Sequence, residues 1–174
     1  SKLLVNYIDI FIKKDRKFAG QRVPALDEFL KFAEQYDNLL LNIEFKDNSM
    51  ELVDKAMTLF REHKLTGRCV FASFYSEIVG YCYDAYGVRT QGFSKHNFTT
   101  FIDGEDGTIS KMYAVGLGVD EVTKEVVADY EKNGIQPWAW CPDDEQSVKH
   151  CLSCGIKLLT CNDVAAALKI VKNR

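Results

Sequence analysis

The sequence predicts an α/β fold in which a parallel β-sheet is covered on its outside by helices. Six strand-like segments alternate with segments whose apolar residues recur with the helical period, and the composition does not change along the 174 residues. A doubly wound nucleotide-binding sheet would need a glycine-rich turn after an early strand, and none is present. The remaining architecture is a TIM-type (β/α)8 barrel.

A complete barrel needs eight strands and typically about 250 residues, so this chain is short by two units. The deficit lies at the N-terminal side, because the sequence opens in an irregular stretch and not in a strand. We therefore expect a barrel that lacks its first two βα units. Residues 1–174 are expected to form this single incomplete domain, and residues 1–22 a linker into the first helix.

Periodicity and end signals define each expected element. Pro24 suits the first turn of a helix, Asn48 or Ser49 can cap the next one, and Asp143 with Gln146 has capping-box spacing. Glycines 87, 134 and 155 follow helical segments and are expected to end them. In order, we expect a helix from 24, strand 39–46, a helix from 48 or 49 to near 67, strand 69–74, helix 78–86, strand 88–93, a polar loop 94–110, strand 111–117, helix 120–133, strand 136–141, helix 143–155, strand 156–160 and helix 163–172.

The strand at 39–46 carries the chemistry that most needs an explanation. Alternate side chains of a strand point to opposite faces, so Asn42, Glu44 and Lys46 share one face while the apolar residues share the other. Charged groups are costly in a sheet buried on both sides, but the carboxyl ends of barrel strands are where active sites gather. Glu44 could bind a hard divalent cation and Lys46 a phosphate. A functional site and a structural ion pair at a solvated strand end both remain open.

Bulk composition excludes several classes of function. With 47% hydrophobic residues, 27% charged residues and a net charge of −3, the chain has no basic stripe for nucleic acid. No apolar run approaches the roughly 20 residues of a membrane span. We expect the six cysteines to be small core residues of a reducing compartment, which with the lack of a visible signal peptide favours the cytoplasm. Cys151 and Cys154 form a lone pair in a helical segment, where we expect no metal or redox chemistry.

Other candidate side chains have simpler interpretations. Ser73 follows a strand without a nucleophile motif and is expected to be a strand-end or capping hydroxyl. His63 and His150 lie in helical segments and are expected at the surface. His96 lies in the polar loop, where substrate contact competes with a surface role. Trp140, at the end of its strand, could form the wall of a pocket or belong to the core.

Four stretches, in chain order, resemble segments of the glycerophosphodiester phosphodiesterases. The resemblance runs from about residue 18 to the C-terminus. The matching stretches are residues 23–30 with 41–46 (Leu-Asn-Ile-Glu-Phe-Lys), residues 70–74, residues 137–140 with 143–145, and residues 154–160. The resemblance implies a (β/α)8 barrel that cleaves a small-molecule glycerophosphodiester to an alcohol and glycerol 3-phosphate with a divalent metal ion, Ca²⁺ or Mg²⁺. It further implies that Glu44 is a metal ligand, that Lys46 lies close to the substrate phosphate, and that Trp140 lines the pocket.

The departures from the family are as informative as the matches. The family's catalytic histidines lie in an N-terminal His-Arg-Gly and a later His-Asp, and neither motif is present in this sequence. The three histidines here match no family position, and Cys141 and Cys161 stand where the family often has Thr and Asp or Asn. We therefore expect no complete catalytic set, and a chain that is inactive alone although its parent is an enzyme.

Two alternatives remain. One is a non-catalytic barrel that binds a phosphorylated ligand or a protein partner, and the other is a different phosphate-handling barrel that reuses the same strand. In each case the open six-strand sheet would expose strand edges, from which we expect a homo-oligomer.

Overall fold

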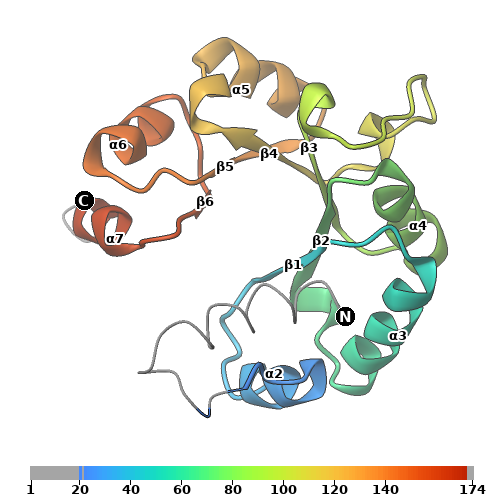
Figure 1. Cartoon of the computed structure of the whole chain (residues 1–174). Helices are drawn as coiled ribbons and strands as arrows, with labels where there is room; N and C mark the ends of the chain where they lie inside the picture. Colours follow the sequence, from blue (N-terminus) through green and yellow to red (C-terminus); the bar gives the residue numbers. More distant parts are fainter. Residues whose placement is uncertain (1–19, 21, 172–174) are drawn as a thin grey trace.

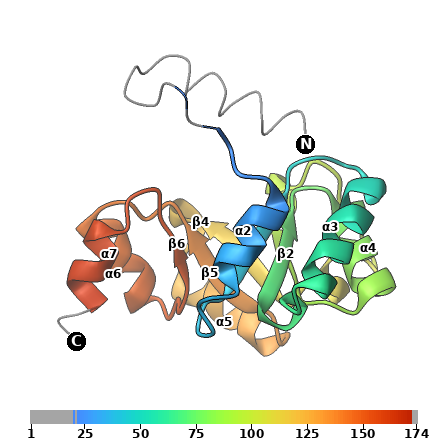
Figure 2. The ribbon, with the colours of Figure 1, turned by 90° about the horizontal axis from the view of Figure 1, so that it is seen from below.

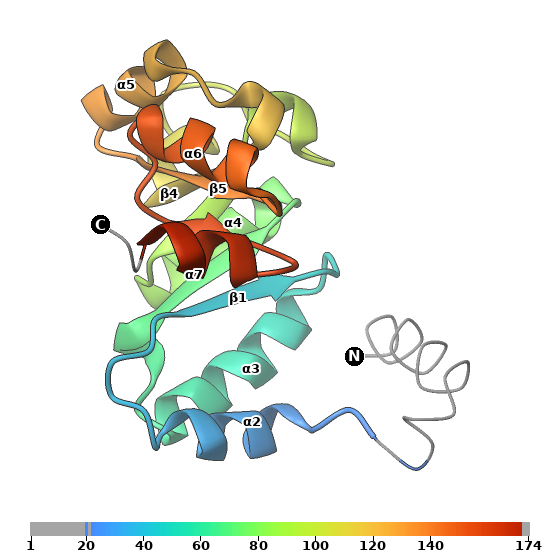
Figure 3. The ribbon, with the colours of Figure 1, turned by 90° about the vertical axis from the view of Figure 1, so that its left-hand side faces the viewer.

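Six parallel strands form one sheet in the computed structural model, which describes residues 20 and 22–171. The strands follow one another in chain order, so that each pairs with the next and β1 and β6 are the edges of the described sheet. Figure 1 shows the sheet curled into an arc, and Figure 3 looks onto the side where β1 lies. The strands are β1 (Leu41–Phe45), β2 (Cys69–Ser73), β3 (Thr90–Phe93), β4 (Ala114–Gly118), β5 (Gln136–Trp140) and β6 (Leu159–Thr160).

Helices lie outside the curled sheet, as the sequence predicts (Figure 1). They are α2 (Leu26–Ala33), α3 (Met50–Glu62), α4 (Ser76–Tyr86), α5 (Lys124–Lys132), α6 (Glu145–Ser153) and α7 (Ala165–Val171). Figure 2 shows α3 and α4 at one end of the arc and α6 and α7 at the other. No helix among the described residues is both long and apolar enough to cross a membrane. The expected linker, apart from residues 20 and 22, lies outside the described residues.

Local signals explain where the helices begin and end. The Ser49 hydroxyl accepts a hydrogen bond from the Leu52 amide, 3.2 Å away, at the start of α3. At the end of α4, Gly87 has a φ of 62°, a left-handed conformation that glycine adopts without steric cost. Both residues were expected in these roles from the sequence.

Several boundaries differ from the expectation; β6, for example, covers only Leu159–Thr160 of the expected strand 156–160. The segment 120–123 is not part of an α-helix. Val119–Glu121 forms a 3-10 turn, and α5 begins only at Lys124, with Thr123 as its N-cap. Residues 111–113 precede β4 and do not belong to it. At α6 the cap is Asp144, whose carboxylate accepts hydrogen bonds from two backbone amides. Asp143 instead accepts hydrogen bonds from Asn162. At two of these boundaries a polar side chain has a distant partner that the linear pattern does not show: Glu121 accepts a hydrogen bond from the Asn97 side chain, and Asp143 accepts one from the Asn162 side chain.

The core lies between the sheet and its helices. Phe60 of α3 and Phe71 of β2 are buried and meet edge to face, with ring centroids 5.1 Å apart. A second cluster joins β4 and β5 to α5 and α6. The cysteines were expected to be core residues, which is correct only in part. Cys69, Cys82 and Cys151 are buried, Cys154 and Cys161 are half-buried, and Cys141 is exposed.

Candidate functional site

A cavity of about 490 Å³ opens at the carboxyl ends of the strands. Its lining residues come from or directly follow β1, β2, β3, β5 and β6, so it occupies the mouth of the curled sheet. Glu44, Lys46 and Trp140, the three site residues predicted from the sequence, all line it. Its other polar side chains are Asn42, Gln91, Thr160 and Asn162. The structure therefore brings the predicted residues to one place.

Glu44 and Lys46 form an ion pair inside this cavity. The Lys46 Nζ lies 2.5 Å from Oε1 of Glu44 and 5.6 Å from the centre of the Phe74 ring. The Glu44 side chain is 29% exposed and the Lys46 side chain is 53% exposed, so water screens the pair and its contribution to stability is about 1 kcal/mol or less. A pair held this weakly can separate at little cost when a ligand offers Lys46 an anionic oxygen.

Two amide side chains extend the polar wall beyond the predicted residues. The Asn42 Nδ2 donates to Gln91 Oε1 over 2.9 Å, which joins β1 to β3 across β2. Gln91 is buried, and a Cβ atom on Gly116 would lie 2.6 Å from its Nε2, so this glycine makes room for the amide. Gln91 was not predicted from the sequence, because its position in the cavity depends on the register between β3 and its neighbours.

Asn162, which follows β6, is hydrogen-bonded to Asp143, which follows β5, at the rim of the cavity. Its Nδ2 donates to Oδ2 of Asp143 and its backbone amide donates to Oδ1, each over 2.7 Å. These hydrogen bonds lower the pKa of Asp143, with the Asn162 side chain as the largest cause. The sequence predicted a helix-capping role for Asp143, and this was wrong: the carboxylate instead braces the end of the last strand.

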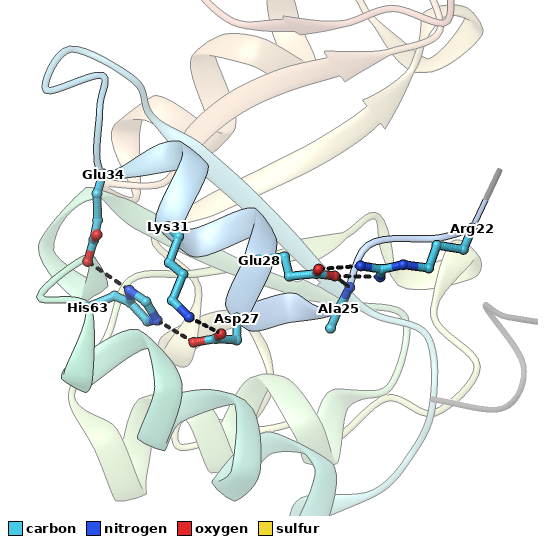
Figure 4. Close-up of polar contacts among 7 residues, drawn as sticks. All are labelled: Arg22, Ala25, Asp27, Glu28, Lys31, Glu34 and His63. Atoms are coloured by element: carbon cyan, nitrogen blue, oxygen red, sulfur yellow. Dashed lines mark hydrogen bonds and ion pairs between the residues drawn. The ribbon is translucent and has the colours of Figure 1, made fainter.

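None of the three histidines lines this cavity. His63 was expected at the surface, but its ring lies between two carboxylates, with Nδ1 2.7 Å from Glu34 Oε1 and Nε2 3.0 Å from Asp27 Oδ1 (Figure 4). His96 is exposed and its Nε2 lies 3.2 Å from Glu121 Oε1. His150 is exposed, as expected, with Nε2 2.8 Å from the Val122 carbonyl oxygen. The cavity has no imidazole to transfer a proton.

Comparison with known proteins gives this geometry a context. No protein-family model matches the chain. A glycerophosphodiester phosphodiesterase from Caldanaerobacter subterraneus subsp. tengcongensis is 20% identical over 97% of this chain and 70% of its own length. In sequence and in fold, this chain resembles the glycerophosphodiester phosphodiesterases. A crystal structure from Galdieria sulphuraria, described as a putative member of that class, superposes with a TM-score of 0.75 at 19% identity, over 88% of this chain and 66% of the other.

A third relative carries a ligand. The Oleispira antarctica phosphodiesterase OLEI02445, solved with the product sn-glycerol 3-phosphate, has a TM-score of 0.69 and 13% identity over 91% of this chain and 65% of its own. This chain thus spans about two thirds of the length of the relatives named here. The predicted TIM-barrel fold class is confirmed, with six parallel strands in a curled partial barrel.

The divalent metal that the resemblance implies finds an incomplete set of donors in this chain. Among the residues that the structure describes, Glu44 is the one carboxylate that lines the cavity, and the other groups there that could ligate a metal are amides, a hydroxyl and the thiols of Cys141 and Cys161. Within the described residues, no group of three His, Cys, Asp or Glu side chains is placed to hold a metal ion. Ca²⁺ takes six to eight oxygen ligands, and Mg²⁺ is usually bound through one or two carboxylates with water and substrate oxygens. Glu44 fits as one ligand, but these residues alone do not make a metal site.

Ser73 has the structural role that the sequence suggested. Its hydroxyl donates to the Phe45 carbonyl oxygen over 3.0 Å and accepts from the Tyr75 amide over 3.1 Å. The first bond joins the ends of β1 and β2, and the second holds the turn that follows β2; together they use the donor and one of the two acceptor sites of the hydroxyl.

Proposed function

We propose that this chain is one incomplete domain, residues 1–174 with a linker over 1–22, of a metal-dependent glycerophosphodiester phosphodiesterase. In the parent enzyme, hydrolysis would release an alcohol and glycerol 3-phosphate. The observation that carries the proposal is the convergence of Glu44, Lys46 and Trp140 on one cavity at the carboxyl ends of the strands. The likeness in sequence to a phosphodiesterase of this class supports it.

Each of these residues has a part in the proposal. Lys46 offers a point charge to the phosphate oxygens, and the second N–H of the Asn42 amide can donate to an oxygen of the glycerol or phosphate group. Trp140 walls the cavity, and Glu44 supplies one ligand to Ca²⁺ or Mg²⁺, which would stabilise negative charge on the phosphoryl group. General acid–base groups must reach the bond that breaks, and no histidine does so here. This chain alone is therefore proposed to bind and not to hydrolyse.

A second candidate function is a barrel that binds a phosphorylated ligand and has no hydrolytic activity in any form. The absence of a histidine from the cavity lining, among the residues that the structure describes, is the observation that favours it. The two candidates differ only in what the natural protein adds to these residues, so activity and mass measured on the protein from its source distinguish them.

The first experiment tests hydrolysis of glycerophosphocholine with Ca²⁺, Mg²⁺ or EDTA, on the chain alone and on the protein isolated from its source. We expect no turnover by the chain, and metal-dependent release of glycerol 3-phosphate by a heavier natural protein. In that protein Glu44→Gln should lower turnover by a hundredfold or more, because it removes a charged metal ligand; this is an order-of-magnitude expectation of about 3 kcal/mol. A natural protein of 19.8 kDa without turnover would leave only the binding function.

The second experiment measures binding of sn-glycerol 3-phosphate to the chain by calorimetry. We expect Lys46→Met to weaken binding by about tenfold or more, because a hydrogen bond to a charged group contributes about 1.5–3 kcal/mol. Lys55→Met is the matched control, since Lys55 has a similar ion pair with Glu51, 2.6 Å away, on the exposed face of α3. Equal affinity of the two variants would contradict the role of Lys46.

A further inference from the structure

We infer that Cys141 and Cys161 form a site of reversible oxidation, a disulfide that closes across the ends of β5 and β6 at the rim of the cavity. The inference rests on the geometry of two strand ends and is independent of the proposed function. Both cysteines line the same cavity, and neither belongs to the buried core.

Strand register brings the two residues side by side. The last ladder pair of β5 and β6 is Trp140 with Thr160, so Cys141 and Cys161 are the next positions on neighbouring strands. The Cys141 amide still donates to the Thr160 carbonyl oxygen over 2.7 Å. Neighbouring strands lie about 4.8 Å apart, which is inside the range of about 4.4–6.8 Å between Cα atoms that a disulfide requires.

The side chains share their surroundings as well. The Asn162 Nδ2 lies 3.3 Å from the Cys141 sulfur, which places that sulfur against the residue that follows Cys161. Cys141 also has a φ of 61°, a left-handed conformation that is uncommon for a residue with a side chain and directs it away from the course of the strand. Burial raises the pKa of the Cys161 thiol, and Asp143, the Cys141 thiol and Asp163 add to that rise.

The two cysteines have different roles in the oxidation by hydrogen peroxide. The exposed Cys141, as thiolate, attacks one peroxide oxygen, the O–O bond breaks, and the leaving hydroxide takes a proton to become water. The Cys161 thiol then loses its proton as its sulfur attacks the sulfur of the resulting sulfenic acid, the S–O bond breaks as the S–S bond forms, and the leaving hydroxide takes up a proton to become a second water. The two thiols lose two electrons in all, and one peroxide is reduced to two molecules of water.

The cross-link would hold the shortest strand of the described sheet. β6 has only two residues and is paired only with β5 in the described sheet. A covalent bond directly beyond it would keep this strand and the cavity wall formed by Thr160 and Asn162 in place. Oxidation should therefore raise the temperature of unfolding.

Peptide mapping tests this directly, because trypsin places the candidate cysteines on separate peptides. Cleavage after Lys132, Lys149, Lys157 and Lys169 puts Cys141 on residues 133–149 and Cys161 on 158–169, with Cys151 and Cys154 on 150–157. After peroxide treatment and alkylation of the remaining thiols, we expect peptides 133–149 and 158–169 to be linked in the monomer, and dithiothreitol to separate them. A link to 150–157, an intermolecular link, or higher oxidation without any link would overturn the inference.

Variants give a second readout. Cys141→Ser and Cys161→Ser should each abolish the link and the rise in unfolding temperature on oxidation. Cys154→Ser, which changes a half-buried cysteine of the neighbouring helix end, should retain both. A rise in unfolding temperature of the same size in Cys141→Ser would show that another group is oxidised. Circular dichroism of each variant before oxidation confirms that it is folded.

Discussion

At the scale of single residues, His63 shows how one side chain joins two helices. The ring lies at the end of α3 and reaches Asp27 and Glu34 at the two ends of α2, and Asp27 also binds Lys31, 2.7 Å away (Figure 4). With a carboxylate at each ring nitrogen, the protonated imidazole has an acceptor for both N–H groups. The hydrogen bonds to Asp27 and Glu34 raise the pKa of His63 above its ordinary value of 6.5.

This arrangement makes stability depend on pH. Because the pKa of His63 is higher in the folded than in the unfolded chain, its contribution is fully present below about pH 6.5 and is lost as the pH rises through the raised value. We expect His63→Gln to destabilise the chain more at pH 5.5 than at pH 8.5, as measured by urea unfolding. The pKa of Asp27 is lowered, so the stability that Asp27 contributes is lost only as the pH falls through this lowered pKa. That range is more acidic than pH 5.5 and does not affect the comparison.

The control is His96→Gln, which removes a histidine that also faces one carboxylate but has a side chain 71% exposed. The two variants should differ in the pH dependence of their stability. An equal loss at both pH values for His63→Gln would show that the ring acts by packing alone.

At the scale of the element, helix α3 depends on its cap. Ser49→Ala removes the acceptor of the Leu52 amide and should lower the free energy of unfolding by about 1 kcal/mol, as is typical of a lost N-cap. Urea denaturation measures this change. Lys55→Ala, at an exposed position of the same helix, should stay within about 0.5 kcal/mol of the parent. A Ser49→Ala variant as stable as Lys55→Ala would contradict the capping role.

Elements were predictable where a local signal decides them, and not where a distant partner does. The periodicity of α3 and the turn at Gly87 were sufficient to define those elements. The predicted start of α5 was wrong for two reasons. Val122 has the spacing of a helical residue but is buried in a loop, and the Glu121 side chain accepts a hydrogen bond from the Gly118 amide. Likewise the cavity positions of Glu44 and Lys46 follow from alternation along β1, whereas Gln91 and Asn162 depend on register and on a contact across strands. His63 was expected at the surface because the pattern of α3 does not show that α2 packs beside it and supplies two carboxylates.

At the scale of the whole molecule, the open sheet has two edges that can pair with another chain. No strand among the described residues pairs with the outer edge of β1 or β6. Unpaired strand edges promote association, so we expect the chain to form oligomers at high concentration, detected by size exclusion with light scattering. Leu40→Lys, which places a charge directly before β1, should reduce association, while Leu168→Lys, at a comparably exposed leucine of α7, should not. A monomer of 19.8 kDa at every concentration would refute this expectation.

Strict pairing of consecutive strands has one more consequence. Each ladder joins a strand to the next in the chain, from Leu41 with Cys69 to Trp140 with Thr160, and no inner ladder uses a strand from elsewhere in the described sheet. The molecule is therefore comparable to a bent one-dimensional array, in which stability is a sum of units and of the interfaces between neighbours. In such an array, removing a unit at one end takes away only that unit and one interface, and the interfaces between the remaining units persist.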